Sequence, residues 1–345
     1  MSNSSSNRIP SLDGLRALSI AAVLMAHSAN HFVGSFVHTR VVQYAFAILS
    51  YFGVTVFFVI SGFLITTLLQ REYLRTSRID IGGFYRRRAA RILPASLFYI
   101  AVILILGHPT WVQSLYALTF TTTYFSGEAY KPLQHLWSLS VEEQFYLLWP
   151  LVFATGLKNA RRYCWVILAI SPVVRLILYR SGYQEFFHCA PAIADSIGAG
   201  CLLAFYQDNL REFVHKYFLS TVSFLLLCGG TVLAAGELYR THIVLLWGAV
   251  PCLIALIIAS AIERKGAFLN SAPVVWVGLL SYSLYLWQQP FLVFDGPLNN
   301  LFVRLFLTFV MAYVSYRLVE QPMLRLRSRK PATTTTVKAP AADAA

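Results

Sequence analysis

The sequence predicts an all-α fold: a polytopic transmembrane helix bundle of about ten spanning helices plus a short interfacial or re-entrant segment, with both termini cytoplasmic. Composition is the first observation, because 57% of the 345 residues are hydrophobic, 12% are charged and the mean hydropathy is +0.60. Soluble globular chains carry about 25% charged residues, so a soluble fold is excluded. The recurrence of apolar segments and the placement of Lys and Arg are the other two observations.

Apolar segments of spanning length recur along the chain. A transmembrane helix needs about 20 mostly apolar residues. Ten segments meet this requirement: 13–33, 44–69, 91–107, 137–157, 163–180, 190–206, 218–235, 244–262, 275–294 and 301–320. The stretch 111–125 is shorter and rich in Thr, which suits an interfacial or re-entrant position better than a full span.

Basic residues set the orientation, because Lys and Arg collect in the cytoplasmic loops of membrane proteins. If 111–125 does not cross, the outer loops hold only Arg40, Lys131, Arg180 and Arg240. A crossing at 111–125 would instead place the basic cluster from Lys158 to Arg162 outside. We therefore predict cytoplasmic termini and a multi-pass location in the cell inner (plasma) membrane.

The chain is predicted to be one membrane domain with a short tail. Residues 1–326 form the transmembrane domain, and 327–345, rich in Ala, Thr and Pro, are expected to be a disordered cytoplasmic tail. The net charge of +13 does not indicate nucleic-acid binding, because no soluble basic domain is there to carry it. The five Cys residues show neither CxxC nor metal-ligand spacing, so we expect no disulfide and no metal. The expected partner is the lipid bilayer, and no pattern indicates an oligomeric state.

Ionisable residues within apolar segments are costly and therefore mark candidate functional positions. Arg16 and His27 are 11 residues apart in the first segment, SLDGLRALSIAAVLMAHSANHF, which places them about 20° apart around a helix and about 16 Å apart along it. Asp13 shares that face and can neutralise Arg16, while Asn30 and His31 extend the polar stripe. The alternative is that Arg16 snorkels to the headgroups and His27 is a satisfied interior histidine.

A second basic cluster lies in FYRRRAARILPA. Arg88 and Arg91 are three residues apart and share a helix face, with Arg86 and Arg87 beside them. Guanidinium groups at a cytoplasmic membrane edge suit bidentate binding of phosphates. The alternatives are contacts with anionic lipid headgroups or simple setting of the topology.

Two adjacent carboxylates, Glu142 and Glu143, lie in LWSLSVEEQFYLLWP, near the outer face in the predicted topology. They point about 100° apart on a helix, which makes them poor candidates for a two-carboxylate glycosidase site. One of them can orient a catalytic base or hydrogen-bond an acceptor hydroxyl. The alternative is an interhelical hydrogen bond or an ion pair with an arginine such as Arg175.

Two further acids lie within apolar segments. Asp195 has no local partner, so it needs one from another helix. Glu320 follows Arg317 by three residues, which favours a local structural ion pair.

Taken together and in order, these segments resemble the acyltransferase-3 family of membrane O-acyltransferases, whose members modify cell-surface polysaccharides, lipopolysaccharide, Nod factors and some antibiotics. The resemblance covers residues 8 to about 326. It is carried by RIPSLDGLRALSIAAVLMAH with its Arg-x10-His spacing, FFVISGFLI at 57–65, FYRRRAARILPA, WSLSVEEQFYLLWP at 137–150, SYSLYLWQQP at 281–290 and EQP at 320–322.

The chain departs from the family pattern at two positions. Family members often carry Arg two positions before the acid matching Asp195, where this chain has Ile193. They also often carry His where this chain has Gln288. The resemblance therefore transfers no catalytic duty to Ile193 or Gln288.

The resemblance implies transfer of an acyl group, expected to be acetyl, from cytoplasmic acyl-CoA to a hydroxyl of a carbohydrate or glycolipid such as exopolysaccharide or lipopolysaccharide. The implied roles are phosphate binding by Arg88 and Arg91 with Arg87, and general-base catalysis by His27 near Arg16, with Asp13 and Glu143 as positioning groups. A covalent acyl-histidine relay is the alternative mechanism. The rival functions are a secondary transporter or flippase and a non-catalytic scaffold.

Overall fold

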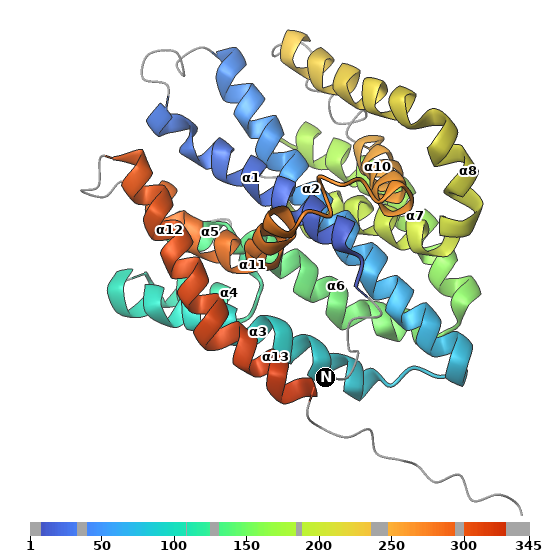
Figure 1. The fold of residues 1–345 in the computed structure, drawn as a ribbon, viewed down its shortest axis with the longest axis horizontal. Coiled ribbons are helices and arrows are strands. Elements are labelled where there is room, and N and C mark those ends of the chain that lie inside the picture. Colours follow the sequence, from blue (N-terminus) through green and yellow to red (C-terminus); the bar gives the residue numbers. More distant parts are fainter. Residues whose placement is uncertain are drawn as a thin grey trace, which may run out of the picture.

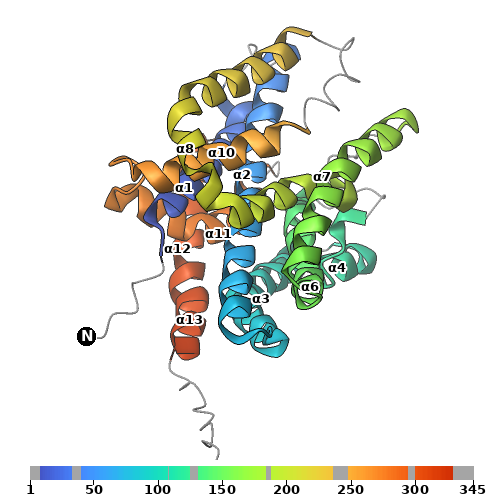
Figure 2. The same ribbon diagram turned by 90° about the vertical axis from the view of Figure 1, so that its right-hand side faces the viewer.

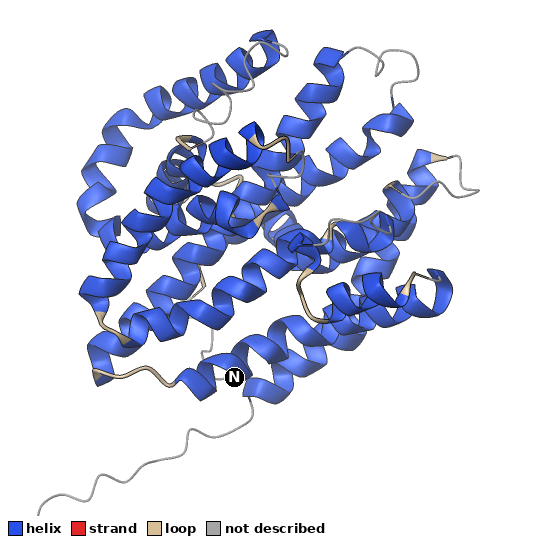
Figure 3. Ribbon diagram, turned by 180° about the vertical axis from the view of Figure 1, so that it is seen from behind, coloured by secondary structure: helices blue, strands red, loops and turns tan. Residues whose placement is uncertain are grey.

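The fold was analysed in a computed structural model that describes residues 8–32, 40–107, 109–124, 131–183, 188–235, 248–293 and 300–328. Within these ranges the regular structure is entirely helical, as predicted, and no strand occurs (Figure 3). The predicted tail 327–345 lies outside the described residues, apart from its first two positions. Figure 1 shows the helices gathered into one bundle, with the N-terminal α1 near its centre.

The first three helices are α1 (Pro10–Phe32), α2 (Arg40–Thr76) and α3 (Ile81–Gly107). α1 packs against α2 and α11, so its polar stripe faces the interior of the bundle. The backbone of α1 is helical through Asn30 and His31, but their side chains lie outside the described part of the chain.

The segment after α3 turns back into the protein without spanning. α4 (Trp111–Leu118) rises only about 12 Å, far less than the roughly 30 Å of a bilayer core. A capping box between Thr110 and Gln113 starts this helix, and a 3₁₀ turn, η2 (Thr122–Tyr124), follows it. The described structure thus agrees with the prediction that 111–125 is not a full span.

α5 (Lys131–Gln134) leads into α6 (Leu136–Ala154) from inside the bundle. The Tyr99 hydroxyl of α3 donates to the carbonyl of Pro132, and Leu133, His135 and Leu136 are all buried. α6 therefore begins within the protein and not at its outer surface.

α7 (Leu157–Arg180) leads to α8 (Ala190–Ala235), which covers two segments that the sequence predicts as separate spans. α8 consists of two helices joined across a kink at Tyr217, where φ is −108° and ψ is 15°, and the bend is visible in Figure 1. The first helix continues through the polar stretch 207–216, and the second follows the kink, where the predicted segment 218–235 begins.

The C-terminal part consists of α10 (Val250–Arg264), α11 (Ala272–Leu292), α12 (Leu301–Ser315), the π-helical turn η5 (Tyr316–Glu320) and α13 (Gln321–Ser328). The last three elements run on as one column past α3 (Figure 2). The predicted segment 244–262 begins outside the described residues, which resume at 248.

Four of the described helices are long and apolar enough to cross a membrane: Ala45–Thr76, Ile81–Gly107, Leu157–Arg180 and Leu301–Arg325. The protein is therefore a multi-pass membrane protein with several candidate spans. The count of about ten spans and the cytoplasmic placement of the termini stay predictions.

Three glycines allow two close helix crossings. A Cβ atom at Gly62 on α2 would collide with the carbonyl of Ile197 on α8, and one at Gly200 on α8 would collide with the carbonyl of Val59 on α2. A Cβ atom at Gly278 on α11 would likewise meet the Asp13 carbonyl on α1. Small residues at membrane helix crossings let backbones approach closely, and here they fix α8 on α2 and α11 on α1.

Candidate active site

α1 supplies three of the predicted site residues from one face. The Asp13 carboxylate lies 3.6 Å from the Arg16 guanidinium and also accepts a 2.7 Å hydrogen bond from Nε of Arg8. Asp13 is buried, and the Arg16 side chain is only 16% exposed. The predicted neutralisation of Arg16 by Asp13 is confirmed, because one carboxylate holds both guanidinium groups at the start of α1.

His27 meets a side chain from the other end of the chain. Its Nδ1 lies 2.8 Å from Oε1 of Gln288 on α11, and Gln288 is fully buried. A carbonyl oxygen accepts a hydrogen bond, so Nδ1 carries the proton in this pair. The lone pair is then on Nε2, which leaves that nitrogen free to act as a base or a nucleophile.

Gln288 is therefore a site residue that the resemblance did not assign. Its sequence signal is one of the two adjacent amides near the end of SYSLYLWQQP, where Gln288 and Gln289 follow the apolar Leu286 and Trp287. An amide that contacts an imidazole can fix its tautomer and ring orientation. The geometry gives Gln288 the role of a positioning group for His27.

A second histidine, His135, lies close to His27 and was not singled out in the sequence. It is buried at the start of α6, within electrostatic range of His27. Its ring packs edge-on against Tyr99 at 5.4 Å between centroids and lies tilted against Tyr285 at 5.3 Å. Its position immediately before an apolar segment was the only signal that could have indicated it.

Arg88 and Arg91 project from α3 toward Arg16, and the three guanidinium groups repel one another. Arg88 lies over the ring of Tyr146 at 5.1 Å, which fixes its plane. In the described part of the chain, no carboxylate oxygen lies at ion-pair distance from Arg88 or Arg91. These arginines keep their donors available for an anion.

Glu142 lies with this cluster, within electrostatic range of Arg16, Arg88 and Arg91. Ser61 Oγ on α2 donates to its Oε1 over 2.6 Å. Glu143 interacts with Arg88 only at longer range, and its buried Oε1 has no hydrogen-bond partner among the described residues. Glu142 thus interacts electrostatically with three arginines, whereas Glu143, the residue that the sequence favoured, interacts with Arg88.

The position of Glu142 and Glu143 along the bundle differs from the expectation. The sequence placed them near the outer face, but the Tyr85 hydroxyl of α3 donates to the Leu147 carbonyl over 2.6 Å. This contact aligns α6 with the start of α3 and brings the carboxylates level with Arg88. The reason is the buried start of α6, which shortens the distance from Leu136 to the arginine cluster.

Arg87, expected beside Arg88 and Arg91, points elsewhere. Its guanidinium lies 3.5 Å from Glu72 and 3.9 Å from Asp80, and its side chain is 41% exposed. These two acids hold Arg87 at the connection between α2 and α3.

Asp195 finds its partner on another helix, as predicted. Arg175 on α7 lies 2.6 Å from Asp195 on α8 and also donates to the Ala192 carbonyl, with both ionised groups buried. Arg175 is therefore paired with Asp195 and not with Glu142 or Glu143. The same geometry explains why Ile193 can be apolar, because α7 supplies the guanidinium group.

The predicted pair between Arg317 and Glu320 is wrong. Arg317 donates to the hydroxyl of Tyr313 and to Gln321, whereas Glu320 is buried, accepts from Ser283 and lies in range of Arg91. Both residues belong to the π-helical turn, whose i→i+5 bonding widens the helix. Residues three apart then no longer share a face.

The comparison with known proteins decides the family. The acyltransferase domain of the acyltransferase-3 type matches residues 9–318, which contain every predicted site residue from Asp13 to Glu143. This chain belongs to the acyltransferase-3 family. The resemblance inferred from the sequence is confirmed.

Three curated relatives are similar to this acyltransferase-3 chain over 91% of its length. O-acetyltransferase OatA of Staphylococcus aureus strain NCTC 8325 is 30% identical over 360 residues, and a putative O-acetyltransferase of S. aureus strain COL is 29% identical over 364 residues. Peptidoglycan O-acetyltransferase OatA of Listeria monocytogenes is 26% identical over 364 residues. The chain spans only 56–57% of the length of these relatives. No solved structure matches this acyltransferase-3 chain.

Proposed function

We propose that the protein is a membrane O-acetyltransferase that moves an acetyl group from acetyl-CoA to a hydroxyl of a cell-envelope carbohydrate. One observation carries the proposal: His27, oriented by Gln288, shares the bundle interior with Arg16, Arg88 and Arg91. The curated relatives are named O-acetyltransferases, and the Listeria relative is named for peptidoglycan. Peptidoglycan therefore joins exopolysaccharide and lipopolysaccharide among the acceptors to be tested.

The arginines suit the phosphates of the donor. Arg88 and Arg91 lie on one face of α3 and have no carboxylate at ion-pair distance among the described residues. Guanidinium groups bind phosphate oxygens through paired, charge-assisted hydrogen bonds. Arg16 adds a third charge from α1. Arg87 is held by Glu72 and Asp80, so the proposal places the phosphates on Arg88 and Arg91.

His27 performs the proton transfer in the simpler of two mechanisms. Its Nε2 removes the proton of the acceptor hydroxyl while that oxygen attacks the thioester carbonyl carbon. The carbon–sulfur bond then breaks, and the leaving thiolate takes the proton from the imidazolium. Gln288 keeps the proton on Nδ1 and so preserves the reactive lone pair.

In the second mechanism Nε2 itself attacks the thioester, which releases CoA and leaves an acetyl group on His27. The acceptor hydroxyl then displaces the imidazole and takes the acetyl group. This route would let the donor bind at one membrane face and the acceptor at the other. The two mechanisms can be distinguished by incubating the protein with labelled acetyl-CoA in the absence of acceptor and then denaturing it. Label attached to His27 is expected in this second mechanism and not in the first.

The remaining carboxylates act as positioning groups. Asp13 forms an ion pair with Arg16. The negative charge of Glu142 offsets the positive charge of the arginine cluster, and Ser61 donates a hydrogen bond to Glu142. Glu143 lies beside Glu142 with one oxygen unpartnered among the described residues, which suits a hydrogen bond from an acceptor hydroxyl.

The test is acetyl transfer by the purified full chain in lipid nanodiscs. Radiolabelled acetyl-CoA is supplied with peptidoglycan fragments, lipopolysaccharide and exopolysaccharide in turn, for the wild type and His27→Ala. We expect label in one carbohydrate with the wild type and none with the variant. Transport of an intact substrate into liposomes, with no label transferred to any acceptor, would contradict the proposal and favour a transporter.

A further inference from the structure

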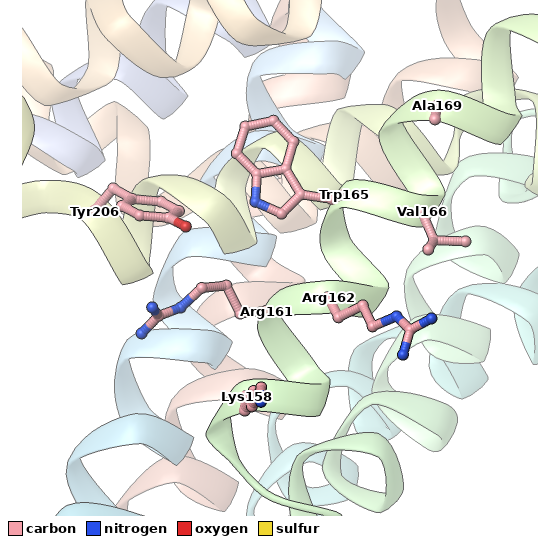
Figure 4. Close-up of a pocket in the computed structure, with 7 residues that line it drawn as sticks. All are labelled: Lys158, Arg161, Arg162, Trp165, Val166, Ala169 and Tyr206. Carbon is pink, nitrogen blue, oxygen red and sulfur yellow. The ribbon is translucent and has the colours of Figure 1, made fainter.

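A groove on the outside of the bundle carries strong positive charge and belongs to no part of the candidate active site. It lies between the start of α7 and α8, and we call it the basic groove (Figure 4). Its lining includes Lys158, Arg161, Arg162, Trp165, Val166 and Tyr206. The mechanism above uses none of these residues.

The cations of the basic groove are not neutralised by the protein. Within the described ranges, no carboxylate oxygen lies at ion-pair distance from Lys158, Arg161 or Arg162. The guanidinium of Arg161 lies over Phe205 at 5.5 Å and over Tyr206 at 5.4 Å. All three basic side chains are exposed.

The backbone adds to this charge. α7 begins at Leu157, and Gly156 before it provides no side-chain cap for the first N–H groups. Uncapped N–H groups at a helix N-terminus carry partial positive charge. The first turn of α7 therefore contributes to the same potential as the three side chains.

Beyond the charges, α7 presents an apolar face to its surroundings. Trp165, Val166, Ile170, Val173 and Ile177 are all exposed along it. α7 is also a candidate membrane span, and only 17% of its most apolar 18-residue stretch is buried inside the protein. This face is therefore in contact with lipid chains in the membrane.

The aromatic residues lie between the charges and the apolar face. Figure 4 shows Trp165 and Tyr206 on the two sides of the groove, with the Arg161 guanidinium beneath Tyr206 and Lys158 at the base of α7. Trp and Tyr favour the headgroup level of a bilayer, where one end of the ring is apolar and the other is wet. The order along α7 is thus cations, then aromatic rings, then an apolar surface.

We infer that the basic groove binds one anionic phospholipid. Its phosphate contacts Lys158 and Arg161, Arg162 adds positive charge from the other side of α7, the glycerol lies beside Trp165 and Tyr206, and an acyl chain follows Val166 along α7. Charge complementarity selects the lipid, since the positive amine of a zwitterionic headgroup would meet like charges here. The groove lies near the end of α2, because Gly156 is beside Tyr73, and so it faces the same leaflet as the connection from α2 to α3.

Native mass spectrometry of the full chain tests this inference, with phosphatidylglycerol and phosphatidylcholine of identical acyl chains as the probes. The groove variant combines Lys158→Gln, Arg161→Gln and Arg162→Gln. Its matched control combines Arg75→Gln, Arg78→Gln and Arg86→Gln, which removes the same charge from exposed residues near the same end of the bundle. We expect the wild type and the control to retain phosphatidylglycerol about 10-fold more tightly than phosphatidylcholine, and the groove variant to show no preference.

Two outcomes would overturn the inference. If the control loses the preference as fully as the groove variant, the attraction is a diffuse effect of net charge. If acetyl-CoA at millimolar concentration displaces the phosphatidylglycerol, the groove belongs to a soluble anion and not to a lipid.

A second readout guards against a folding defect. Phosphatidylglycerol brominated on its acyl chains should quench the fluorescence of Trp165 more than brominated phosphatidylcholine, and the difference should vanish in Trp165→Phe. Arg161→Lys keeps the charge and is expected to keep the preference. Thermal melting in phosphatidylcholine nanodiscs, equal for all variants, shows that the fold is intact.

Discussion

At the residue scale, the contact between His27 and Gln288 is the point from which the chemistry is set. A neutral histidine carries its proton on one of two ring nitrogens, and the hydrogen-bond partner of one nitrogen decides whether the other has a free lone pair. Here an amide oxygen accepts the hydrogen bond of Nδ1, so Nε2 keeps its lone pair in a partly buried site. Arg88 and Arg91 lie on a different helix, α3, so proton transfer and donor binding can be changed separately.

Replacing Gln288 tests the orienting contact. Gln288→Met keeps the size of the side chain but removes the acceptor oxygen, and we expect kcat to fall about 10- to 100-fold with KM for acetyl-CoA unchanged. Gln288→Glu retains an acceptor oxygen and is expected to retain more activity than Gln288→Met. Steady-state kinetics in nanodiscs measure the split. Equal losses in the two variants would contradict the orienting role.

Replacing Arg91 tests donor binding. Arg91→Gln removes charge-assisted hydrogen bonds, and we expect KM for acetyl-CoA to rise about 10- to 100-fold. Acetyl-pantetheine, which lacks the phosphates, should react equally slowly with the wild type and the variant. Arg86→Gln, an exposed neighbour on α3, is the matched control and should leave KM within about 2-fold of the wild type. An effect of Arg91→Gln on both donors alike would refute phosphate binding.

At the scale of the elements, glycines decide how closely the helices approach one another. Gly62 and Gly200 let α2 and α8 cross with backbone in contact, and Ser61, next to Gly62, then reaches Glu142 on α6. The spacing of α2 and α8 is therefore connected to the carboxylate that balances the arginines. The π-helical turn acts in a similar way, because it directs Glu320 inward while Arg317 stays at the surface.

Adding a methyl group at a crossing tests this packing. Gly200→Ala would push a Cβ atom into the Val59 carbonyl, and we expect a loss of about 1–3 kcal/mol in the free energy of unfolding. Gly266→Ala is the control, since no atom lies within 4 Å of the added methyl, and its effect should stay within about 0.5 kcal/mol. Unfolding in mixed detergent and SDS micelles provides the measurement. Similar free energies of unfolding for the two variants would show that α2 and α8 can move apart at this crossing without loss of stability.

At the scale of the whole molecule, the features that could be predicted were those that depend on a single helix. The 100° rotation per residue was enough to place Asp13 and Arg16 on one face, and the motif order was enough to indicate the family. Contacts between distant segments were not predictable, because the pairing of His27 with Gln288 joins residues 261 positions apart. The position of Glu142 along the bundle depends on the buried start of α6. The inward direction of the Glu320 side chain depends on a π-helical turn that has no simple sequence signal.

The predicted topology places the two ends of α7 on opposite sides of the membrane. Tyr73 near the end of α2 lies beside Gly156 at the start of α7, and the 24 residues of α7 rise about 36 Å, enough to cross a bilayer core of roughly 30 Å. Exposed cysteines placed at Arg78→Cys and Ser181→Cys should therefore react from opposite sides. With an impermeant maleimide, we expect Ser181→Cys to label in intact cells and Arg78→Cys only after permeabilisation. Labelling of both in intact cells would rule out the predicted topology.

The glycine at position 278 has a consequence for motion. It brings the backbone of α11 against that of α1 at Asp13, and the same two helices carry Gln288 and His27. Two helices locked at one point and hydrogen-bonded at another move as a rigid pair. The base and its orienting amide thus stay in register while other helices shift. A wider passage for a bulky acceptor would then come from displacement of α3, which carries Arg88 and Arg91, or of α6 relative to that pair.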